Sequence, residues 1–130
     1  MSSTRHDRHS DHGPAIKTAI AAWRETEEAL TPVIGRLGYD ALLERTLRAI
    51  GGRYHWLKPV AAASAPARLR ALEQALAARD PAQAAAAQSL LQSTFAQLLE
   101  HLIGRALARR LLREHVKTFP LSDAEGDTER

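Results

Sequence analysis

Hydrophobic residues in this chain recur three and four positions apart, the spacing of α-helices that bury one face. The spacing is clearest in the segments 14–30, 39–50, 66–79 and 82–117. Strands favour β-branched and aromatic residues, but isoleucine, valine and threonine are sparse here and aromatic residues make up only 5%. The pattern predicts an all-α fold, an up-and-down bundle of about four helices with a long C-terminal helix and flexible termini.

The segment 82–117 is the longest of these and is predicted to be the central helix. Asp80 can cap the first free amide groups, and Pro81 suits the first helical turn because it has no N–H to lose. Alanines then favour helix by intrinsic propensity, and the next proline is Pro120. A single helix over this segment would be ~54 Å long at 1.5 Å per residue.

The apolar residues of this segment do not stay on one side of the predicted helix. An α-helix advances ~100° per residue, so apolar residues four apart drift by ~40° at each step. This spacing relates Leu91, Phe95, Leu99, Ile103, Leu107 and Leu111. Either the second half of a straight helix packs on another protomer, which we favour, or the helix breaks or bends near Gly104. In a third interpretation, Leu107 and Leu111 cover a loop of their own chain. In the first of these cases Ile103, Leu107 and Leu111 form the interface of a homo-oligomer, a dimer in its simplest form.

Polar segments flank the predicted helical domain, which covers residues 14–119. Residues 1–13 contain His6, His9 and His12, a spacing typical of loose Zn²⁺ or Ni²⁺ sites. We favour a solvated, disordered tail, because no rigid element holds the imidazoles. Residues 120–130 are predicted to be a flexible acidic tail. We expect neither a metal site nor a cofactor in the domain itself.

Composition narrows the classes of function. The chain has no cysteine, which excludes disulfides, thiolate metal sites and a cysteine nucleophile. The formal net charge of +3 is too small to indicate nucleic-acid binding by itself. The N-terminal segment lacks the apolar stretch of a signal peptide, and no run approaches the ~20 apolar residues of a membrane span. We therefore expect a cytoplasmic protein that does not act at a membrane.

The tetrapeptide His55-Trp56-Leu57-Lys58 resembles the phosphoacceptor motif of histidine-phosphotransfer domains, which are four-helix bundles. The resemblance implies that His55 accepts a phosphoryl group, that Lys58 helps to bind it, and that the partner is another signalling protein. It covers four residues and fails at the next one, where Pro59 replaces the glycine of the family. Proline should stop the helix that presents the imidazole. In the competing interpretation, His55 helps to terminate a turn beside Trp56.

A basic ridge is predicted near the end of the last segment, where Arg105, Arg109, Arg113 and Lys117 are four residues apart. Arginines can hold phosphates or carboxylates of a partner. Binding of single-stranded nucleic acid would also favour interleaved aromatic residues, and the ridge has none. We favour a simpler interpretation, in which cations near a helix C-terminus suit the helix dipole.

Side-chain catalysis has little support in the sequence. There is no glycine-rich phosphate loop, no nucleophile elbow and no helical metal-binding motif. The leading hypothesis is a non-enzymatic interaction or regulatory domain that self-associates through the second half of the segment 82–117. Histidine phosphotransfer through His55 is the alternative, and nucleic-acid binding by the basic ridge is a second one.

Overall fold

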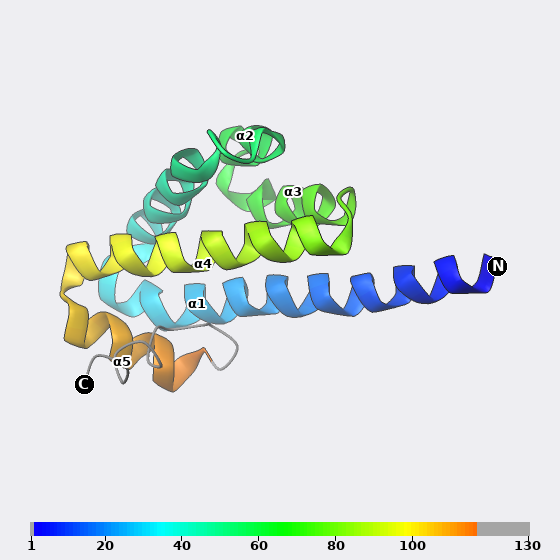
Figure 1. Cartoon of the computed structure of the whole chain (residues 1–130). Coiled ribbons are helices and arrows are strands. Elements are labelled where there is room, and N and C mark those ends of the chain that lie inside the picture. The colour runs from blue at the N-terminus through cyan, green and yellow to red at the C-terminus, as the bar shows by residue number, and fades with distance from the viewer. Residues whose placement is uncertain (1, 117–130) are drawn as a thin grey trace, which may run out of the picture.

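The computed structural model describes the backbone of residues 2–116 and the side chains of residues 13–114 and 116. The described residues contain helices and no strand, so the predicted all-α fold is confirmed. In chain order the elements are α1 (Ser2–Ile50), the 3₁₀ helix η1 (His55–Leu57), α2 (Lys58–Ala62), α3 (Ala65–Ala77), α4 (Pro81–Ile103) and α5 (Arg105–His115) (Figure 1). Lys117 and the acidic tail 120–130 lie outside the described residues.

Helix α1 consists of two helical segments joined at Gly35, which has φ 82° and ψ 161°. Only glycine adopts this conformation without strain. After Gly35 the chain reverses, and the Tyr39 hydroxyl donates a hydrogen bond of 3.1 Å to the carbonyl of Trp23, 16 residues earlier. A straight helix would separate these two positions by ~24 Å. Gly35 alone connects the two helical segments, because the helix resumes at Arg36.

Residues 2–13, where we expect a disordered tail, form the first turns of α1 in the structure (Figure 1). The side chains of residues 1–12 are not among those described. The interpretation of His6, His9 and His12 as solvated rather than metal-binding therefore stays a prediction.

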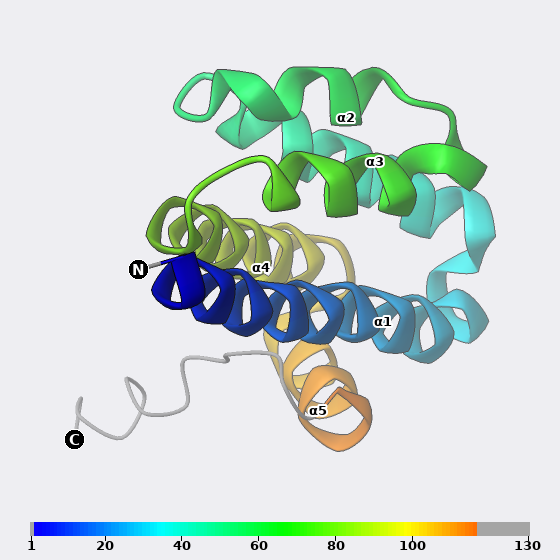
Figure 2. The same ribbon diagram turned by 90° about the vertical axis from the view of Figure 1, so that its right-hand side faces the viewer.

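The central element is α1, not the segment 82–117 that we expected. Every other helix among the described residues contacts α1. Helices α4 and α5 lie on either side of its first segment, and α2 and α3 lie on the side away from α5 (Figure 2). The expectation failed because helix length alone does not say which helix lies in the middle of a bundle.

Three aromatic rings form the centre of the core. Trp23 and Phe95 are fully buried, with ring centroids 5.3 Å apart in an edge-on arrangement. Tyr39 packs on the same phenylalanine at 5.8 Å. These contacts join both segments of α1 to α4. Buried leucines surround the rings, among them Leu30, Leu47, Leu72, Leu76, Leu91 and Leu99.

The predicted segment 82–117 is divided at Gly104, which has φ 97° and ψ 148°. The straight helix that we favoured is therefore wrong, and the alternative of a break near Gly104 is confirmed. Helix α5 turns back and buries Ala108, Leu112 and Val116. The apolar line drifts around the helix in the sequence because two separate helices each have their own buried face. The predicted cap of α4 is present, since Gln83 N donates to Asp80 Oδ1 at 2.8 Å.

We expect Gly35→Ala to lower the free energy of unfolding by about 1–3 kcal/mol, the usual cost of placing a side chain in this backbone region. A Cβ atom at Gly35 would meet no atom within 4 Å, so the cost comes from the backbone and not from a clash. Urea denaturation followed by circular dichroism measures it. The matched control is Gly52→Ala, where a Cβ also meets nothing within 4 Å and φ is not positive. Equal midpoints for the two variants would contradict this explanation.

Burial raises the pKa of Tyr39 well above its ordinary value of 10.0, and the negative charges of Glu27 and Asp40 raise it further. The unfolded tyrosine ionises near pH 10 whereas the folded one keeps its proton, so Tyr39 destabilises the fold as pH rises above 10. We expect Tyr39→Phe to cost about 0.5–1.5 kcal/mol at pH 7 through the lost hydrogen bond. Above pH 10 this gap to the wild type should narrow in urea titrations. A gap that stays constant from pH 7 to about 11 would contradict the assignment.

Candidate functional site

Four large hydrophobic side chains of the described residues are exposed: Val33 (45%), Leu37 (83%), Leu102 (57%) and Leu107 (39%). They flank the two glycine turns, Val33 and Leu37 around Gly35 and the other two around Gly104. Both turns lie at the same end of the molecule, on the left in Figure 1. We call these four residues the apolar end. A single exposed leucine is ordinary, but exposed leucines gathered at one end indicate a contact surface.

An apolar groove lies between the second segment of α1 and the last turns of α4. It encloses about 540 Å³ and is lined by Gly38, Ala41, Leu42, Arg45, Leu98, His101 and Leu102. Small residues on the α1 side leave the space, and leucines from both helices make its walls apolar. Leu102 belongs to both the groove and the apolar end, so the two surfaces are continuous. A groove of this kind can accept an aliphatic side chain from a partner, with a basic residue on each helix beside it.

The predicted interface residues are separated by the structure. Ile103 and Leu111 are partly buried against the core of their own chain, and only Leu107 is exposed. The sequence missed Leu37 and Leu102, which are the most exposed leucines of the described residues. Leu37 falls between the predicted segments 14–30 and 39–50, and Leu102 continues the apolar face of the first half of the segment 82–117.

His55 and Lys58 are both exposed, but they do not share one long helix. His55 lies on η1 and Lys58 begins α2, where Pro59 occupies the first turn. This part of the chain is helical on both sides of the Leu57–Lys58 junction, because proline fits a helix start. Trp56 packs edge-on against Tyr54 at 5.8 Å between ring centroids, and the Arg79 guanidinium lies 5.1 Å from the Trp56 ring. These contacts involve Trp56 and not His55, so both interpretations of His55 stay predictions.

Ionic contacts hold the N-terminal part of the predicted basic ridge against the end of α4. The Glu100 carboxylate lies 3.4 Å from Arg109 Nε and 3.9 Å from Arg105 Nε. Arg113 is exposed on α5, and Lys117 lies outside the described residues. The nine-residue separation of Glu100 and Arg109 is not a helical pairing distance, and only the turn at Gly104 brings the two together. These contacts favour a structural role for Arg105 and Arg109 over binding of an external anion.

Comparison with protein-family models, curated proteins and solved structures found no match to this chain. Among the described residues, no helix is both long and apolar enough to cross a membrane. The same residues contain no group of three or more histidine, aspartate or glutamate side chains placed to hold a metal ion.

We expect Glu100→Gln to lower the free energy of unfolding by up to ~1 kcal/mol, because it removes the carboxylate that joins α4 to α5. The Glu100 and Arg109 side chains are only 24% and 20% exposed, so solvent screens this pair less than a fully exposed one. The loss should shrink in 1 M salt. The control is Glu114→Gln, which removes a more exposed pair within α5. Indistinguishable urea midpoints for the two variants would show that the contact between the helices adds no stability.

Proposed function

We propose that this chain is a helical interaction domain without catalytic activity, and that it forms a homodimer through the apolar end and the apolar groove. The observation that carries the proposal is the exposure of Leu37 and Leu102 beside a groove of about 540 Å³. Exposed apolar surface next to a concave apolar surface is typical of protein–protein contacts. Burying these leucines would stabilise a complex by removing their surface from water.

A second copy of the chain is the partner that these features fit best. In a two-fold symmetric contact the same surface meets itself, so one surface must carry both the projecting group and the recess. The apolar end and the apolar groove share Leu102 and form one surface. This surface carries both features, because Leu37 projects at the turn and the groove begins at Gly38. A leucine of one protomer can therefore enter the groove of the other while the reverse contact forms at the same time. Leu107 would extend this contact onto α5.

We keep the self-association predicted from the sequence, but we centre the interface on Leu37 and Leu102. Leu107 remains part of the surface, while Ile103 and Leu111 contribute to the core of their own protomer. Changing Leu111 would therefore disturb the monomer and could not test the interface cleanly. The turn residues Leu37 and Leu102 can be changed with less risk to the fold, because they are largely exposed.

The first test combines Leu37→Ser with Leu102→Ser. Analytical ultracentrifugation over a range of concentrations should give a dimer for the wild-type chain and a monomer for the double variant. Circular dichroism should show the same helix content for both, because the side chains removed are 83% and 57% exposed. A wild-type chain that remains monomeric at the highest concentration would overturn the homodimer. The groove would then have to serve a different partner.

A second test separates the groove from general surface effects. Ala41→Lys places a positive charge in the groove beside Arg45 and should dissociate the dimer, because a buried unpaired ammonium group is costly. Ala85→Lys is the matched control, since Ala85 is also an exposed alanine on a helix but does not line the groove. Loss of the dimer in both variants, or in neither, would contradict a contact made through the groove.

A further inference from the structure

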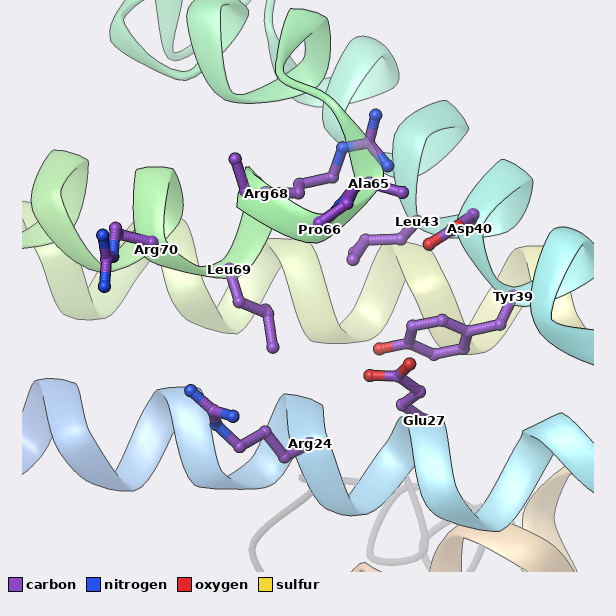
Figure 3. Close-up of a pocket in the computed structure, with 11 residues that line it drawn as sticks. Arg24, Glu27, Tyr39, Asp40, Leu43, Ala65, Pro66, Arg68, Leu69 and Arg70 are labelled. Atoms are coloured by element: carbon purple, nitrogen blue, oxygen red, sulfur yellow. The ribbon is translucent and has the colours of Figure 1, made fainter.

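A second cavity of about 500 Å³ lies between the two segments of α1 and the start of α3 (Figure 3). Its volume is within the range of small-molecule sites in proteins. The cavity lies on the other side of the second segment of α1 from the apolar groove, because that helix gives Tyr39, Asp40 and Leu43 to the cavity and Ala41, Leu42 and Arg45 to the groove. It is therefore a separate site, independent of the proposed dimer.

The charges around this cavity are segregated by sign. Glu27 and Asp40 lie near Tyr39 at one end, and the guanidinium groups of Arg24 and Arg70 lie toward the other end (Figure 3). Leu69 projects from α3 between the two ends (Figure 3). Burial is the main reason why the pKa of the Tyr39 hydroxyl is raised, and the negative charges of the two carboxylates raise it further. The cavity is therefore negative at one end, positive at the other and apolar between them.

These four charged groups do not neutralise one another. Within the described residues, the ion pairs join other side chains and leave Arg24, Glu27, Asp40 and Arg70 without an ionic partner. The two carboxylates are half-buried. Removing a carboxylate from water without a partner is unfavourable, so a cation delivered to this end would gain a strong interaction. The two arginines can hold a carboxylate at the opposite end.

Arg68, although it also lines the cavity, uses its charge elsewhere. Its side chain is buried, and its Nη2 donates to the carbonyl of Ala63 at 2.7 Å and lies 3.8 Å from a Glu44 carboxylate oxygen. Figure 3 shows the guanidinium directed away from Arg24 and Glu27. Arg68 therefore holds the start of α3 against the α2–α3 connection, and the charges available to a ligand are those at the two ends of the cavity.

We propose that this cavity binds a small zwitterion, a short apolar peptide, with its ammonium group at Glu27 and Asp40 and its carboxylate at Arg24 and Arg70. An apolar side chain of the ligand would pack against Leu69. A ligand with both charges satisfies both ends at once, whereas a simple amine or a simple acid leaves one end uncompensated. The ligand class follows from this separation of charge, and the volume leaves room for more than one residue.

The experiment is isothermal titration of the full-length chain with four probes: leucyl-leucine, leucine, isoamylamine and 4-methylpentanoate. Leucyl-leucine should bind saturably, and the amine and the acid should bind at least about tenfold more weakly, the effect of losing one charged hydrogen bond. Leucine should also bind more weakly than the dipeptide, because its ammonium and carboxylate are attached to the same carbon and cannot reach both ends of the cavity at once. No saturable binding of leucyl-leucine, or equal binding of leucine, the amine or the acid, would overturn the proposal.

Matched variants locate the binding. Glu27→Gln and Arg24→Gln should each weaken binding of the zwitterion at least about tenfold. Glu28→Gln and Arg36→Gln are the controls, because both residues are exposed on α1 and neither lines the cavity. Unchanged thermal unfolding of each variant shows that its fold is intact. Binding that survives Glu27→Gln and Arg24→Gln, or that falls equally in the controls, would place the ligand outside this cavity and overturn the proposal.

Discussion

The structure depends on the reversal of α1 at Gly35. This one residue turns the second segment back, so that Tyr39 bonds to the carbonyl of Trp23 and packs on Phe95. Trp23 packs on the same phenylalanine, so a single aromatic cluster joins both segments of α1 to α4. In a chain with only 5% aromatic residues this cluster is the main source of large buried rings. The positions of α2 and α3 follow from it, because both come after the second segment in the chain.

The same backbone feature, a glycine with a positive φ angle, occurs a second time at Gly104, between α4 and α5. At both glycines an added Cβ would meet nothing within 4 Å, so glycine is needed for its dihedral angles and not for lack of space. Ile34 and Ile103, directly beside the two glycines, pack against the core, whereas Leu37 and Leu102 remain exposed. The apolar end therefore lies beside the two short turns.

The second segment of α1 separates two surfaces of opposite chemistry. Leu42 faces the apolar groove, and Asp40 and Leu43 face the charged cavity. Positions one residue apart on a helix point ~100° apart, so one short helix can serve both surfaces. The groove offers burial of leucine, and the cavity offers separated charges. The proposed homodimer and the proposed zwitterion site therefore use different faces of one helix and can be tested independently.

Several features of this protein were determined by local sequence. The 3.6-residue spacing of apolar positions indicated helices, Asp80 and Pro81 marked the start of α4, and Gly104 marked where a break was the alternative to a continuous helix. The tertiary structure alone decided that α1 is central, that Leu37 and Leu102 are exposed, and that Glu100 meets Arg109. The physical reason is that periodicity defines the buried face of each helix, whereas the direction of the next helix depends on the dihedral angles of one glycine. A glycine permits many such directions, and only packing of the whole chain selects one.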